Sequence, residues 1–313
     1  MSNVHFSTSA YVQLHVLKGG HSRNVNCVAF SPDGAHLASG GDDQALSIWH
    51  ISQGRLLYRL LFKSAVDTIL WHPVHPDTVI VGCANGTLQQ VHDFSDLLLT
   101  EQYDINLGAR TTVHCLDYDA TTQRLAIGMG EEVHLTKEHS RNRYHGDLVF
   151  PSPPEPEGFS STGDRRLRPI SLHFDQNGSV LIVSYLAHGI VCWDATKRTQ
   201  LCFFRRLGVF CAHQVISGGA ALSPDRSRFA VYNCVDGLDV YPVGPYKKQS
   251  PLMSFKFPRA PQSRHGLNVS YVHRGHGLMS GTTTGSVCLW ETQTGDLWQA
   301  LPHDGKDPNH LVP

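Results

Sequence analysis

The sequence lacks an excess of either positive or negative charge. Of its 313 residues, 26 are Lys or Arg and 27 are Asp or Glu, so the net charge is −1 with neutral histidines. A protein that holds DNA or an anionic membrane over a broad surface needs a large positive excess. We therefore expect neither nucleic acid nor membrane among its partners.

Long apolar runs are also missing. The N-terminal residues MSNVHFSTSAYVQ contain no apolar core of a signal peptide. The longest apolar stretch, residues 179–193, is interrupted by Ser184, His188 and Gly189. It is shorter than the ~18–20 residues that a membrane helix needs, and we interpret it as two buried strands. We expect a soluble intracellular protein, and the sequence does not distinguish cytoplasm from nucleus.

Paired cysteines are absent as a motif. The eight cysteines are scattered without any C-x-x-C pair, and most lie in apolar runs such as Cys27 in NVNCVAF and Cys192 in GIVCWD. Such spacing fits neither a structural zinc site nor a redox motif. We expect buried free thiols that behave as small hydrophobic residues, as in a reducing compartment.

Several enzyme motifs are lacking too. The chain contains no G-x-x-x-x-G-K-[ST] loop, no G-x-G-x-x-G after a strand and no G-x-S-x-G elbow. We predict no catalytic residue, no cofactor and no small-molecule substrate.

What the sequence does contain is a repeat. No long segment has helical periodicity, and short β-rich runs alternate with Gly, Pro, Asn and Asp turns. The clearest unit is residues 18–50, for which we predict strands at 25–30, 36–40 and 46–49. Five weaker copies follow, as expected of a repeat architecture. Their third strands end 42 to 58 residues apart, at Trp49, Val91, Leu135, Trp193, Tyr241 and Trp290.

This pattern resembles the WD-repeat β-propeller family over nearly the full length, and its details are similar to fungal WD-repeat proteins. The resemblance implies an all-β fold in which four-stranded sheets, the blades, stack in a ring. It also implies that the outer strand of each blade comes from the start of the next repeat. We predict a single domain over residues 1–313, with a Pro-rich loop insertion at 151–163.

The number of blades is open between six and seven. Six repeats are recognisable, while residues 11–16 and residues 296–301 both read as outer strands. A six-bladed ring has room for one of these two strands. A seven-bladed ring has room for both, but the strands between them are absent. We favour the second alternative, an incomplete seven-bladed ring.

The resemblance further implies a hydrogen-bond network formed by His21, Ser39, Asp43 and Trp49. In the family the Asp accepts from the His, the His contacts the Ser, and the Ser reaches the Trp indole. Ser280 and Trp290 hold matching positions in the sixth repeat, with Thr284 in place of the Asp. A His–Ser–Asp set also suggests a catalytic triad. Because the spacing is that of the structural motif, we expect a structural network.

Two H-x-x-H pairs, His72/His75 and His273/His276, fall in predicted turns. A zinc site needs further Cys, Asp or Glu ligands that converge on the ion. The sequence shows no such residue beside either pair, so we predict no metal.

The function implied by the resemblance is a non-catalytic scaffold for protein–protein interaction and complex assembly. Other proteins or peptides would bind the top face, the end of the ring that carries the loops between blades. We predict Ser22, Asn24 and Asp42 as contacts. The alternative is a propeller enzyme, lactonase- or dehydrogenase-like, with a metal or cofactor in the central channel. It would need carboxylates and amides at the inner ends of several strands, where VNCVAF and ISLHFD are mostly apolar.

Overall fold

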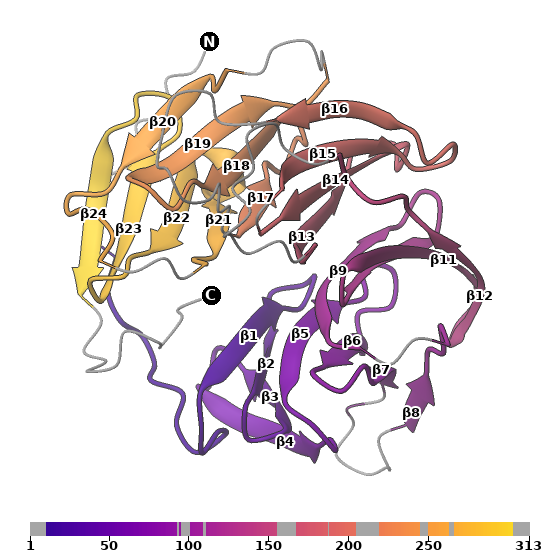
Figure 1. Ribbon diagram of the computed structural model, residues 1–313. Coiled ribbons are helices and arrows are strands. Elements are labelled where there is room, and N and C mark those ends of the chain that lie inside the picture. The colour runs from indigo at the N-terminus through magenta and orange to yellow at the C-terminus, as the bar shows by residue number, and fades with distance from the viewer. Residues whose placement is uncertain are drawn as a thin grey trace.

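Six four-stranded antiparallel sheets, arranged in a ring, make up the molecule (Figure 1). The computed structural model describes residues 11–92, 94, 101–108, 111–154, 167–186, 188–204, 219–244, 250–262 and 266–302. Apart from one short 3-10 turn at His273–Gly275, the regular elements of these residues are all strands. The predicted all-β propeller is confirmed.

Each sheet takes four consecutive strands of the chain, and we number the sheets one to six in chain order. Sheets one and two contain β1 (Val25–Phe30), β2 (His36–Gly41), β3 (Ala45–His50), β4 (Arg55–Leu61), β5 (Val66–Trp71), β6 (Thr78–Cys83), β7 (Leu88–His92) and β8 (Glu101–Asp104). Sheets three and four contain β9 (Val113–Asp119), β10 (Arg124–Met129), β11 (Glu132–Ser140), β12 (Arg143–Val149), β13 (Pro169–Phe174), β14 (Val180–Tyr185), β15 (Gly189–Asp194) and β16 (Gln200–Phe204). Sheets five and six contain β17 (Ala220–Leu222), β18 (Arg228–Tyr232), β19 (Gly237–Pro242), β20 (Met253–Lys256), β21 (Val269–Val272), β22 (Gly277–Gly281), β23 (Ser286–Glu291) and β24 (Leu297–Pro302).

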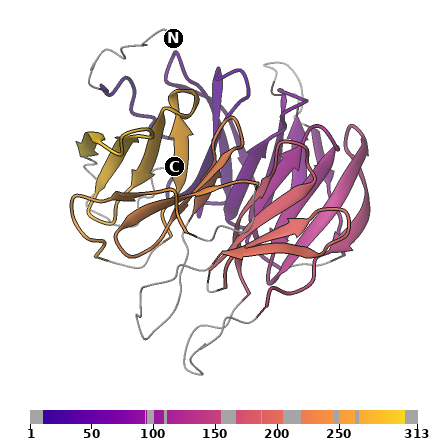
Figure 2. The same ribbon diagram turned by 90° about the horizontal axis from the view of Figure 1, so that it is seen from above.

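One of the two predicted outer strands forms and the other does not. Strand β24, predicted at residues 296–301, pairs with β23 and is the outer strand of sheet six. Residues 11–16 form no strand, so that prediction is wrong. The backbone N–H of Tyr11 donates to the side-chain oxygen of Gln299 at 2.9 Å, so this segment lies beside sheet six (Figure 2). Among the described residues it is tied to β24 through that side chain rather than through a strand ladder.

Apolar clusters fill the spaces between neighbouring sheets. Five buried clusters join sheet one to two, two to three, three to four, four to five and five to six. Among the described residues, none of these clusters joins sheet six to sheet one. Burial of apolar area is the main stabilising contribution to such a fold, so the ring is held mainly through five of its junctions.

An aromatic position near the end of the first strand, opposite the second residue of the next strand, shows the effect of the sixth junction. Trp71, Tyr118 and Phe174 hold this position in sheets two to four, where each packs toward the preceding sheet and is at most 6% exposed. Phe30 holds it in sheet one and is 62% exposed. The face of sheet one that contains Phe30 is therefore not covered as its counterparts are. The chain forms six sheets, and the seven-bladed ring stays a prediction.

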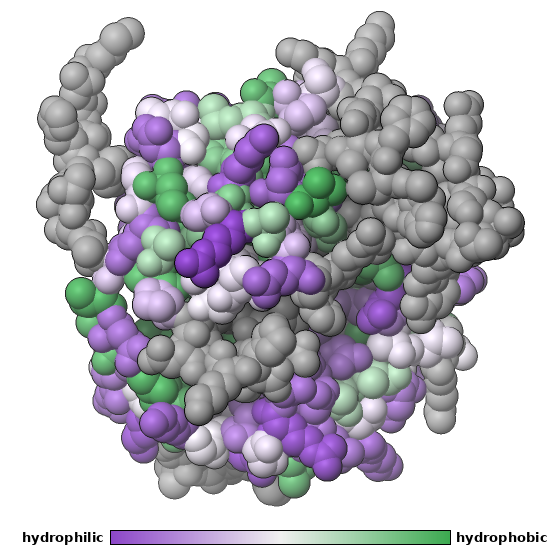
Figure 3. Space-filling view, turned by 60° about the vertical axis from the view of Figure 1, so that its left-hand side comes forward, coloured by the Kyte–Doolittle hydropathy of each residue, from purple (hydrophilic) through white to green (hydrophobic). Residues whose placement is uncertain are grey.

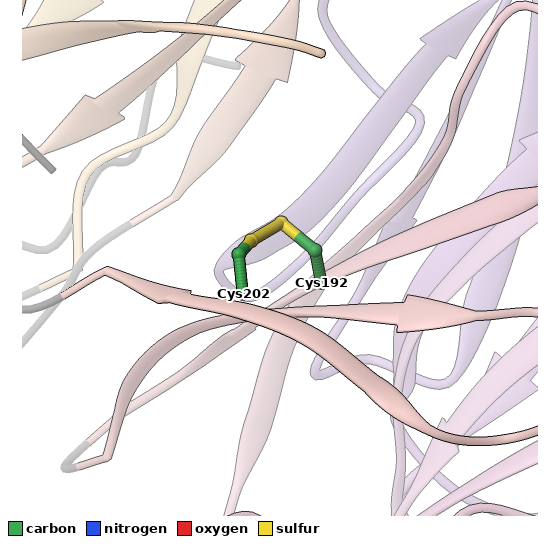
Figure 4. Close-up of a disulfide and its surroundings, with 2 residues drawn as sticks. All are labelled: Cys192 and Cys202. Atoms are coloured by element: carbon green, nitrogen blue, oxygen red, sulfur yellow. A yellow bond between two sulfur atoms is a disulfide. The ribbon is translucent and has the colours of Figure 1, made fainter. Parts of the chain in front are cut away.

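Two cysteines depart from the expectation of free thiols. Cys192 in β15 and Cys202 in β16 are directly opposite each other, with Cα atoms 5.0 Å apart, and form a disulfide (Figure 4). For this pair the sequence-based prediction is wrong. It failed because ten residues separate the two cysteines, and only the β15–β16 register brings them face to face. The free cysteines of the described residues are Cys27, Cys83, Cys115, Cys234 and Cys288.

The surface is mixed in character. On the side shown in Figure 3, hydrophobic residues are scattered among hydrophilic ones. No helix of the described residues is long and apolar enough to span a membrane. Strand β12 ends just before the Pro-rich insertion, and residues 155–163 of that insertion lie outside the described residues.

Candidate functional site

The structure brings the four network residues of the first repeat together. The His21 Nδ1 lies 2.9 Å from Asp43 Oδ1, and its Nε2 lies 2.7 Å from the Ser39 hydroxyl. The Trp49 indole N–H donates to the same hydroxyl at 2.9 Å. Because a carboxylate only accepts, His21 donates to Asp43 and accepts from Ser39. Every polar group in this chain of bonds thus has a partner.

Ser39 is not placed as a nucleophile. It is 4% exposed, and its oxygen already accepts the Trp49 N–H. A triad serine must instead present its oxygen to a substrate carbonyl. The geometry resembles a triad in its His–Asp and His–Ser distances, but the buried hydroxyl suits a structural bond.

Asp43 also binds two donors that the sequence analysis did not include. Its Oδ2 accepts from the backbone N–H of Ser22 at 3.0 Å and from the Arg59 guanidinium at 3.1 Å. Burial alone would raise the pKa of Asp43. The bonds from His21, Ser22 and Arg59 outweigh burial and hold this pKa at about 2. Arg59 lies on the outer strand β4, and no spacing rule in the sequence marks it.

The matching positions in sheet six are arranged differently. The Ser280 hydroxyl lies 3.0 Å from the carbonyl oxygen of Asn268, and Thr284 bonds Thr282 at 3.0 Å. Trp290 is buried against Phe255 of sheet five, with ring centroids 6.1 Å apart. The histidine that most closely precedes β21 in the sequence is His265, which lies outside the described residues.

The predicted partner-binding residues lie together at one end of the ring. Ser22 and Asn24 are exposed in the loop before β1, and Asp42 is half-buried in the β2–β3 turn. The Asn24 side chain donates to Asp42 at 3.3 Å. All three residues border the loops that we call the top face.

A cavity of about 360 Å³ opens beside them, and its wall is formed by residues of sheets one to four and of the loops that lead into sheets five and six. This volume lies within the range of small-molecule and side-chain binding pockets. Its lining residues are Asn26, Asp42, Asp67, His114, Arg168, Ile170, Leu186, Gly219, Gly266 and Asn268.

β-bulges place several of these side chains in the cavity. Asn26, Asp67 and Ile170 are each the second residue of their sheet's first strand, where the pairing register shifts by one residue. A bulged residue has no partner on the neighbouring strand, so its side chain is turned from the regular alternation. In the sequence these strands are mostly apolar, and nothing in their alternation marks Asn26 and Asp67 as cavity residues. Their position, one after the first strand residue, is the signal that marks them.

Negative charge predominates in the cavity. The Asn26 amide donates to Asp42 at 2.8 Å and, less closely, to Asp67 at 3.4 Å, so the two carboxylates share one amide group. Burial and the neighbouring Asp42 charge raise the pKa of Asp67. Burial and the Arg168 charge lower the pKa of His114 to about 4, so His114 is neutral at pH 7. Two carboxylates therefore face a single guanidinium.

A second polar group lies between sheets two and three, away from the cavity. It consists of His72, His75 and Glu138, whose ligand atoms lie within 4.8 Å of one another. It is the one set of three potential metal ligands found in the described part of the chain. Burial acts to raise the pKa of Glu138, but bonds from His72 and Tyr118 outweigh it and lower this pKa. Sequence reasoning missed Glu138 because it lies 66 residues from His72, in the next sheet.

Comparison with known proteins identifies a repeat family in the first sheet. Residues 11–50 match the family "WD domain, G-beta repeat". The chain is 39% identical to the Xenopus laevis ribosome biogenesis protein bop1-A over 86 residues, which are 27% of this chain and 12% of that protein. It is 43% identical to the Medicago sativa small ribosomal subunit protein RACK1 over 108 residues, 34% of this chain and 32% of that protein. The chain thus spans a third or less of each of these relatives.

Among solved structures, the Cps50 (Swd1) β-propeller domain of Myceliophteria thermophila is similar. The TM-score is 0.66, with 16% identity, and the match covers 90% of this chain and 87% of that domain. At this identity the likeness concerns the fold.

Proposed function

We propose that this WD-repeat β-propeller is a non-catalytic scaffold that holds a partner protein at its top face. The relatives are named as ribosome biogenesis proteins and a ribosomal subunit protein, which supports a role in assembling protein complexes. An intracellular location accords with those names.

The observation that carries this proposal is the cavity lined by residues of four sheets and of the loops that lead into the other two. Five buried apolar clusters join neighbouring sheets, so residues from separate repeats are held in a fixed arrangement before a partner arrives. A preorganised site loses little conformational entropy on binding. Ser22 and Asn24 at the rim add polar groups that a partner's backbone can bind.

The charge of the cavity favours a partner with a basic side chain. Asp42 and Asp67 share the amide of Asn26, so each retains acceptor capacity. A lysine or arginine side chain placed between them would make charge-assisted hydrogen bonds to both carboxylates. Ile170 and Leu186 offer apolar wall for the aliphatic part of such a side chain. The proposed partner therefore presents a basic residue on a segment narrow enough to enter the cavity.

Quantitative co-purification tests this function. The tagged wild-type chain, the double variant Asp42→Asn/Asp67→Asn and the control Asp296→Asn would be expressed equally. Asp296 is an exposed carboxylate in the β23–β24 turn, at the opposite end of the ring. We expect one set of proteins to be recovered with the wild type and the control, and about tenfold less with the double variant, the loss that about 1.4 kcal/mol produces. Equal recovery with all three, with unchanged circular dichroism, would refute the top-face proposal.

A further inference from the structure

The group between sheets two and three lies at the other end of the ring. His72 directly follows β5, and His75 lies in the β5–β6 turn. Glu138 belongs to β11 of sheet three and faces these histidines across the junction of the two sheets. The sequence pair H-x-x-H thus receives a carboxylate from a different repeat.

The two carboxylate oxygens of Glu138 differ in their hydrogen bonding. Oε2 accepts from the Tyr118 hydroxyl at 2.5 Å and from His72 Nε2 at 3.1 Å. Oε1 is buried and has no hydrogen-bond partner among the described residues, while the residue as a whole is 5% exposed. A buried acceptor without a partner is destabilising, and more so when it is charged. The second oxygen is therefore a position for a further ligand.

His75 is placed to share that ligand. Its Nε2 lies 3.8 Å from Glu138 Oε1, beyond hydrogen-bonding distance. Two atoms that each lie about 2.0–2.2 Å from one zinc ion at the tetrahedral angle are roughly 3.4 Å apart. A shift of a few tenths of an ångström would bring both onto one ion. The His75 side chain is 30% exposed, which gives the ion a path from solvent.

His72 has a different role, which its ring hydrogen bonds determine. Its Nδ1 accepts from the backbone N–H groups of Val74 at 3.2 Å and His75 at 3.1 Å. The proton of the neutral ring is therefore on Nε2, which donates to Glu138. Ligation through Nε2 would need that proton on Nδ1 and would cost both backbone bonds. His72 is thus a positioning residue that orients the carboxylate, as outer partners commonly do in metal sites.

We propose that Glu138 Oε1 and His75 Nε2 bind a divalent transition-metal ion of the zinc type, with His72 and Tyr118 orienting Glu138. Water, or a donor from a partner protein, completes the coordination. Such a site would fasten sheet two to sheet three and offer an open metal position at the end of the ring opposite the cavity.

Zinc binding by the purified full chain tests the proposal, measured by competition with a chromophoric chelator. The matched control is His276→Gln, since His273 and His276 form the same H-x-x-H spacing in the corresponding turn of sheet six. We expect one zinc equivalent in the wild type and the control, and its loss in His75→Gln and Glu138→Gln. His72→Gln should weaken binding about tenfold without abolishing it. Zinc should raise the melting temperature of the wild type and not that of His75→Gln.

Several outcomes would overturn the proposal. They are an absence of zinc binding by the wild type, equal binding by His75→Gln and the control, or abolition by His72→Gln with retention by His75→Gln. If Glu138→Gln fails to fold, His75→Gln decides alone, because that side chain is partly exposed and makes no buried bond that folding requires.

Discussion

Asp43 shows how much a single side chain is expected to contribute to sheet one. It accepts from His21, from the Ser22 backbone and from Arg59. Asp43→Ala leaves these donors short of a partner, and we expect a loss of about 1–3 kcal/mol in the free energy of unfolding. Urea melts at pH 7 measure it. Thr284→Ala, at the matching position of sheet six, removes one hydroxyl bond to Thr282 and should cost less. Equal losses would contradict the structural role of the network.

The same carboxylate should make stability depend on pH in the acid range. The pKa of Asp43 is about 2 in the folded chain, below its ordinary value of 3.8. A lowered folded pKa adds stability that is fully present above about pH 5 and is lost as the pH falls toward 2, about 2 kcal/mol in all. The difference in unfolding free energy between wild type and Asp43→Asn should therefore narrow between pH 5 and pH 2. A constant difference over that range would show that the charge of Asp43 contributes nothing.

At the scale of strands, the sequence repeat predicted the ends of a strand well where turn residues follow that strand. The first strand was predicted at residues 25–30 and is observed at Val25–Phe30, because SPDG after it sets a tight turn. Sheet three has no such marker after Leu135. Strand β11 continues to Ser140, and Leu135 pairs with Ala126 on the face toward sheet four. Thr136 is the residue that holds in sheet three the pairing register that Trp49 holds in sheet one. In EEVHLTKEHS either alternation phase is plausible, so the sequence alone cannot choose between them.

Two matching phenylalanines, in sheets one and four, provide a test at the same scale. Phe30 and Phe174 end the first strands of sheets one and four at the same register, but Phe174 is fully buried and Phe30 is 62% exposed. Phe174→Ala should cost about 3–5 kcal/mol in unfolding free energy, since it leaves a core cavity. Phe30→Ala should change the unfolding free energy by no more than about 0.5 kcal/mol, as substitutions of surface residues do. Urea melts of both variants measure this, and similar losses would mean that the Phe30 face is covered in solution.

At the scale of the whole molecule, contacts between sheets are what the sequence could not provide. The period predicted six sheets, but nothing in it states which residues of different repeats meet. Glu138 reaches His72 across one junction. Asp67 of sheet two reaches the Asn26 amide of sheet one across another, where that amide also binds Asp42 of its own sheet. These meetings depend on the rotation of each sheet relative to the next. The rotation follows from packing of the five apolar clusters rather than from any local motif.

The central claim is that the top-face cavity holds a basic side chain of a partner. A double-mutant cycle tests it directly, with a peptide from the partner recovered by co-purification. Binding would be measured by isothermal titration for wild type and Asp42→Asn/Asp67→Asn, each with the native peptide and with its lysine or arginine replaced by glutamine. We expect a coupling free energy of at least about 1.5 kcal/mol, because a close pair of charges is present only in the native combination. Additive losses, with no coupling between the carboxylates and any basic residue of the peptide, would contradict the account.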